Sequence, residues 1–150
     1  MGTYQTVMVG TDGSDSSYLA VERAARLARD SAAKLVIVCA YRAASAREVA
    51  DAEEVLGGDA YQVVGSTPAE ETLRVAAERA AALGASEVER VAVPGEPVKS
   101  LISTVSERQA DLLVVGNRGL NTLAGRLLGS VPADVSRRAS CDVLIVHTVR

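Results

Sequence analysis

Short stretches of uninterrupted apolar residues recur along the 150-residue chain, and they constrain its fold more than any other feature. A continuous apolar run with little polar alternation is typical of a parallel strand that helices cover on both faces. Four such runs occupy residues 6–10, 35–40, 112–115 and 143–146, and a less regular stretch at 88–93 is consistent with a fifth strand. We therefore expect an α/β protein.

Segments of helical periodicity separate these runs. Residues 15–29 carry one apolar stripe, and Ser14 is suited to cap that helix. A second helix is expected from Thr67, which forms a capping box with Glu70 and is followed by Pro68, to about residue 84. Further helices are expected from Pro97 and over residues 131–138.

This alternation predicts one domain over residues 1–150 with a doubly wound, five-stranded parallel sheet in the order 3-2-1-4-5 and helices on both faces. Residues 42–66 form an unusually long connection, and residues 46–56 within it have near-helical apolar spacing. Whether this insertion is a lid or a surface excursion stays open.

Composition argues against several kinds of partner. The net charge is −3 and four Tyr are the only aromatic residues, so neither a basic face nor a stacking platform for nucleic acid is expected. No apolar run reaches the roughly 18 residues that a membrane span needs, and the first residues lead directly into a strand pattern with no basic segment before it. We expect a cytoplasmic protein without nucleic-acid or membrane partners.

The two cysteines, Cys39 and Cys141, are too few for a zinc site. In the predicted strand order they belong to strands that two other strands separate. We therefore expect two free thiols, because a disulfide needs Cα atoms within about 7 Å.

A glycine motif follows the fourth apolar run. Gly116-Asn117-Arg118-Gly119 is followed after nine residues by Gly129-Ser130, where a helix can begin. Glycine lets the backbone approach an anion closely, and the free N–H groups of a helix start attract negative charge. The alternative is that these glycines serve only turns, but the strand before and the helix after favour phosphate binding.

The first strand ends in Gly10-Thr11-Asp12-Gly13-Ser14. In the predicted order this strand lies beside the fourth, at the point where ligands of open α/β sheets bind. Asp12 suits the base or ribose end of a nucleotide, and its alternative is a local turn. The sole histidine, His147, and the absence of a nucleophile elbow or a P-loop lysine favour binding over catalysis.

These motifs resemble the nucleotide-binding branch of the universal stress protein family over the whole chain. The resemblance rests on the glycine spacing, on the ending of the first strand and on the closing Cys141-Asp142-Val143-Leu144-Ile145-Val146. Two departures are Gly10, where most members have Pro, and Arg118, where many have His. The resemblance implies a Rossmann-like sheet, a homodimer and an adenine nucleotide, with the family binding ATP, AMP and cyclic AMP (cAMP).

The expected nucleotide-binding residues are Gly10, Thr11, Asp12, Ala40, Val115, Gly116, Arg118, Gly119, Gly129, Ser130 and Val131. The expected function is to sense or sequester ATP or a related adenine nucleotide. A slow ATPase or phosphoryl-transfer enzyme on the same site is the alternative, and Mg²⁺ as a companion of the nucleotide is left open. The apolar edge strand from Val143 to Val146 is expected to pair with a second copy of the chain.

Overall fold

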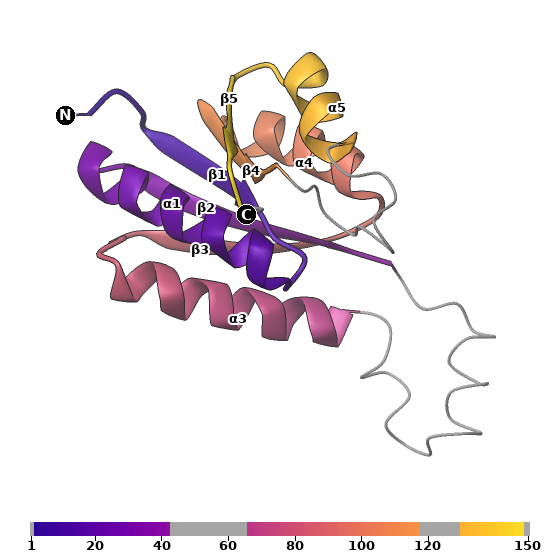
Figure 1. The fold of residues 1–150 in the computed structure, drawn as a ribbon, viewed down its shortest axis with the longest axis horizontal. Coiled ribbons are helices and arrows are strands. Elements are labelled where there is room, and N and C mark those ends of the chain that lie inside the picture. The colour runs from indigo at the N-terminus through magenta and orange to yellow at the C-terminus, as the bar shows by residue number, and fades with distance from the viewer. Residues whose placement is uncertain (1, 43–65, 118–129, 149–150) are drawn as a thin grey trace.

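The computed structural model describes residues 2–42, 66–117 and 130–148. Strands and helices alternate along these ranges: β1 (Thr6–Gly10), α1 (Asp15–Ser31), β2 (Lys34–Tyr41), α3 (Ser66–Ala82), β3 (Val88–Pro94), α4 (Pro97–Arg108), β4 (Leu112–Gly116), α5 (Ser130–Arg138) and β5 (Asp142–Val146). The strands form one parallel sheet in the order β3-β2-β1-β4-β5 (Figure 1). The predicted fold class and strand order are confirmed.

Helices cover both faces of the sheet, as the continuous apolar runs predict. Alternate residues of β1 point to opposite faces: Val7 and Val9 pack with α1 and α3, whereas Met8 packs with α4 and α5. All three side chains are fully buried, and each contributes roughly 1.5–3 kcal/mol relative to an exposed side chain. The core contains no Phe or Trp and is built mainly from aliphatic residues and Ala, with Met8, Tyr18 and Cys39 among them.

The starts of α1 and α4 agree with the sequence expectation, whereas those of α3 and α5 lie one residue earlier. Ser14 caps α1 as predicted, because its hydroxyl accepts a hydrogen bond from the Ser17 N–H at 3.1 Å. Helix α3 begins at Ser66, so Thr67 already lies inside it and the predicted capping role of Thr67 is wrong. Pro68 is tolerated there because the first four N–H groups of a helix have no intrahelical partner.

The other element boundaries agree with the sequence expectation or differ from it by no more than two residues. Both edges of the sheet are as predicted, with β3 on one side and β5 on the other. Cys39 and Cys141 are free thiols, as expected from the two strands that separate them. The predicted helix at residues 46–56 lies outside the described residues.

Candidate nucleotide site

Strands β1 and β4 are neighbours, and the sheet order reverses between them. Chain connections after β1 run to one face and those after β4 to the other, and in open α/β sheets such a reversal places the ligand crevice at the carboxyl ends of these strands. Gly10 ends β1 and Gly116 ends β4, and both are buried. The sequence prediction that these two strand ends meet is therefore confirmed.

The turn after β1 is held by a buried hydroxyl pair. Thr11 is 1% exposed, and its Oγ1 lies 2.7 Å from the Ser17 Oγ in the first turn of α1. The Thr11 backbone N–H donates to the Val38 carbonyl at 2.9 Å, which fastens the turn to β2. The Gly13 N–H donates to the Thr11 Oγ1 at 3.2 Å. The hydrogen bonds of Thr11 thus stabilise the turn that follows β1.

Asp12 and Gly13 shape the turn that leads into α1. The Asp12 Oδ1 accepts a hydrogen bond from the Ser14 N–H at 3.0 Å, so the local-turn role of this half-buried carboxylate is present. Gly13 has a φ of +85°, and a Cβ there would lie 2.9 Å from the Thr72 Oγ1 of α3. Glycine is favoured at this position, because a side chain would be strained by the backbone conformation and would crowd Thr72.

Three polar residues, Ser16, Asn117 and Thr148, interact at this end of the sheet, and the sequence did not predict that they would. Thr148, just after β5, lies against Gly116 and hydrogen-bonds to Asn117 and to Ser16 of α1. The Ser16–Thr148 contact spans 132 positions, so no local pattern could have revealed it. The Asn117 Nδ2 lies 3.2 Å from the Nδ1 of the exposed His147.

Negative charge is distributed unevenly around the crevice. The α1 end carries Asp12 and Asp15, and its helix start is already capped by Ser14. Burial raises the pKa of the Cys39 thiol to about 11, and the carboxylates of Asp12 and Glu70 add to this effect. The first turn of α5 carries no acidic residue. An anionic group is therefore better accommodated at the α5 start than at the α1 start.

The remaining predicted residues fall into two groups. Ala40 is half-buried near the end of β2, Val115 is buried in β4, Ser130 begins α5, and the Val131 side chain is buried beneath α5. Arg118, Gly119 and Gly129 lie outside the described residues. Within the described ranges, no three His, Cys, Asp or Glu side chains are grouped to hold a metal ion, and no helix is long and apolar enough to span a bilayer.

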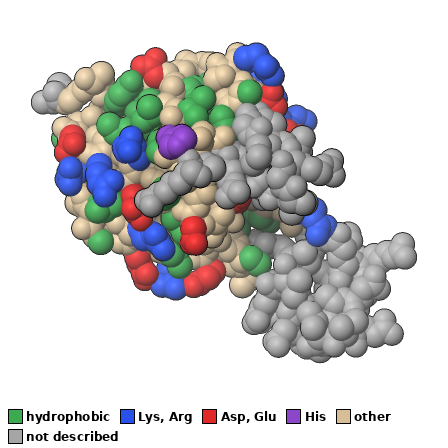
Figure 2. Space-filling model, viewed as in Figure 1, with side chains coloured by type: hydrophobic (Ala, Val, Ile, Leu, Met, Phe, Trp, Pro, Cys, Tyr) green, Lys and Arg blue, Asp and Glu red, His purple; other side chains and the backbone are tan. Residues whose placement is uncertain are grey.

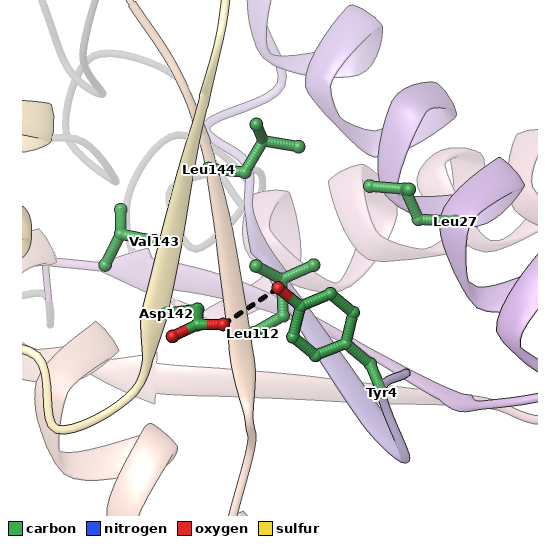
Figure 3. A pocket seen from close by; sticks show the side chains of 6 residues that line it. All are labelled: Tyr4, Leu27, Leu112, Asp142, Val143 and Leu144. Carbon is green, nitrogen blue, oxygen red and sulfur yellow. Dashed lines mark hydrogen bonds between the residues drawn. The ribbon is translucent and has the colours of Figure 1, made fainter. Parts of the chain in front are cut away.

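A separate pocket of about 470 Å³ lies at the opposite end of β4 and β5 (Figure 3). Leu27 of α1 and Leu144 of β5 face into it from its two sides. The Tyr4 hydroxyl donates to the Asp142 carboxylate at 2.9 Å across its floor. Leu112 and Asp142 begin their strands, so this pocket is remote from the crevice at the carboxyl ends.

Comparison with known proteins identifies the family. The family model described as the universal stress protein family matches residues 3–147. The chain belongs to the universal stress protein family. A universal stress protein of Mycobacterium tuberculosis (strain H37Rv) is 55% identical over 148 residues, which cover 99% of each chain. A putative universal stress protein of Staphylococcus aureus (strain NCTC 8325) is 36% identical and covers 99% of this chain and 87% of its own.

Solved structures of universal stress proteins share this fold. One that was crystallised in complex with cAMP is 49% identical, with a TM-score of 0.75 and coverage of 97% of this chain and 98% of its own. The universal stress protein UspA of Lactobacillus plantarum has a TM-score of 0.77 at 20% identity, covering 98% and 100% of the two chains. The second likeness extends the shared fold to a distant member of the family.

Proposed function

We propose that this universal stress protein binds an adenine nucleotide in the crevice between the carboxyl ends of β1 and β4, and so senses or sequesters it. The observation that carries this is the cAMP complex of a relative 49% identical over nearly the whole chain. The convergence of Gly10, Asp12 and Gly116 on one crevice supports the same reading. We take residues 1–150 to act as one cytoplasmic domain.

The charge distribution suggests how the nucleotide lies. Asp12 would accept hydrogen bonds from the base or ribose, and Ala40 would pack against the adenosine beside it. The phosphate would lie at the start of α5, against Ser130 and Val131, with the glycines at 116, 119 and 129 and Arg118 around it. The absence of acidic residues from the first turn of α5 supports this orientation.

The preferred nucleotide decides what the protein senses. Cyclic AMP is the first probe because the relative was crystallised with it, and ATP and AMP share its adenosine end. With ATP, Mg²⁺ would be bound chiefly by the phosphates, as is usual for this ion. We expect binding without efficient turnover, and sustained ATP hydrolysis above roughly 1 per second would favour the enzyme instead.

Calorimetric titration with cAMP, ATP and AMP side by side tests this function. Ser130→Ala should weaken the best ligand roughly ten- to hundredfold, since one hydrogen bond to a charged group is worth about 1.5–3 kcal/mol. Ser136→Ala is the matched control on the same helix, because its exposed hydroxyl donates only to the Ala133 carbonyl at 2.8 Å. A wild-type protein that binds none of the three nucleotides would contradict the proposal.

We also propose that the partner of this chain is a second copy, paired through β5. Strand β5 is an edge strand, and Ile145 on it is 45% exposed. In the view of Figure 2, hydrophobic side chains gather over this part of the surface. The pocket between Leu27 and Leu144 adjoins the same edge (Figure 3). An antiparallel match with the same strand of another copy would cover both the edge and this apolar surface.

A further inference from the structure

Thr148 joins three elements at the carboxyl end of the sheet. Its Oγ1 lies 2.6 Å from the Ser16 Oγ of α1 and 3.0 Å from the Asn117 Oδ1 that follows β4. Its backbone N–H donates to the same Asn117 oxygen at 2.9 Å. Thr148 itself follows β5 and is 8% exposed. The relay Ser16–Thr148–Asn117 thus connects the start of α1, the end of β4 and the end of β5.

The number of protons that each group can donate assigns a direction to the hydrogen bonds of this relay. The Asn117 Oδ1 accepts hydrogen bonds from both the backbone N–H and the hydroxyl of Thr148. The only proton of the Thr148 hydroxyl is therefore donated to Asn117. Ser16 must therefore donate to Thr148. The Asn117 NH₂ group is left to face His147 and donates to its Nδ1. The Thr148 hydroxyl therefore both accepts and donates, and a side chain without a hydroxyl at position 148 would interrupt the relay.

The relay bears directly on Gly116. A Cβ on Gly116 would lie 3.2 Å from the Thr148 Oγ1 and 3.3 Å from its Cγ2, so Thr148 rests on the bare backbone of this glycine. The Asn117 backbone N–H donates to the Val146 carbonyl at 2.8 Å. Gly116 and Asn117, where the predicted glycine loop begins, are therefore held in place from the side of β5 and α1.

We propose that Thr148 is a positioning residue for the nucleotide site, which acts by holding Gly116 and Asn117 through its hydroxyl. This inference rests on the proposed function, because it assigns the relay to the same crevice. If Gly116 and Asn117 are already held in place before the nucleotide binds, they lose less conformational freedom on binding. The affinity for the nucleotide is higher as a result. The relay itself need not touch the nucleotide.

Two variants at position 148 separate the hydroxyl from the packing. Thr148→Val keeps the shape against Gly116 and removes the hydroxyl, and we expect cAMP to bind about five- to tenfold more weakly. Thr148→Ser keeps the hydroxyl and removes the methyl group, and we expect affinity within about twofold of wild type. A role in packing alone would give the reverse order. Thermal unfolding of the ligand-free variants establishes that both remain folded.

A double-mutant cycle tests whether the relay acts as a unit. Ser16→Ala should weaken cAMP binding in the wild-type background and have no further effect in the Thr148→Val background. Ser136→Ala should leave affinity unchanged in both. Unchanged cAMP affinity in folded Thr148→Val, or additive effects of the two variants, would overturn the inference while leaving the proposed function intact. A wild-type protein that binds none of cAMP, ATP and AMP would overturn both.

Discussion

At the scale of the residue, the two cysteines differ in how deeply they are buried. Cys39 is 5% exposed and its pKa is raised to about 11, whereas Cys141 is half-buried, with its pKa raised by burial and by Asp142 and Asp111. The thiolate is the reactive form. Neither thiol should therefore react readily near neutral pH, and Cys39 should be the slower of the two.

We predict that iodoacetamide at pH 8 modifies Cys141 first and Cys39 only on unfolding or as the pH approaches about 11. Mass spectrometry of digested samples assigns each site, and denatured, unreduced protein should show two free thiols per chain. Cys141→Ser is the control, since it leaves only the slow thiol. Modification of native Cys39 at the rate of a free cysteine would contradict the raised pKa.

Gly116 shows that a sequence motif can predict a local backbone role but not the contacts that the residue makes across the fold. The sequence predicted that Gly116 lets the backbone approach a phosphate. The structure adds that Thr148 rests on this glycine, a contact across the fold that no spacing rule contains. The turn role of Asp12 was foreseen as an alternative and is present. Its role toward a ligand stays a prediction, as do those of Arg118, Gly119 and Gly129.

At the scale of the element, Glu89 joins the β3 edge to β2 and α4. Its Oε1 lies 2.8 Å from the Lys34 Nζ, as an ion pair rather than a well-aligned hydrogen bond, and its Oε2 lies 3.1 Å from an Arg108 Nη2. These cations lower the pKa of the Glu89 carboxyl, with Lys34 having the larger effect. Its contribution to stability should be fully present above the unfolded pKa of about 4.3.

We predict that Glu89→Gln is less stable than wild type at neutral pH, and that the difference shrinks as the pH falls through the lowered pKa of Glu89. Urea unfolding across a pH series gives the difference directly. Glu78→Gln removes an exposed partner of Arg74 on α3 and should change stability little at any pH. A Glu89→Gln deficit that is the same in acid as at neutral pH would contradict this.

Elements were predictable where a local pattern determines them. Each apolar run, and the capping of α1 by Ser14, involves residues that are close together in the sequence, and the structure confirms both kinds of prediction. The start of α3 was missed by one residue because Ser66 and Thr67 both suit a helix start, and the pattern alone does not choose between them. The relay through Thr148 was missed because its members come from separate elements.

At the scale of the whole molecule, the exposed β5 edge predicts a dimer. Ile145→Glu should place like charges close together across a two-fold interface and shift the protein toward monomer. Sedimentation velocity at micromolar concentration measures the shift. Arg90→Glu is the control, because it changes the charge of an exposed residue on the opposite edge strand, β3. A wild-type protein that sediments as a monomer would contradict the dimer.

The location of the nucleotide is the central claim, and amide chemical-shift mapping during a cAMP titration tests it most directly. We predict that the largest changes occur at Thr11, Asp12, Ala40, Gly116 and Asn117, around the carboxyl ends of β1 and β4. The amides of Gly84 and Asp111, near the opposite ends of β3 and β4, should not move. Changes confined to that opposite end, or to the pocket between α1 and β5, would contradict the account.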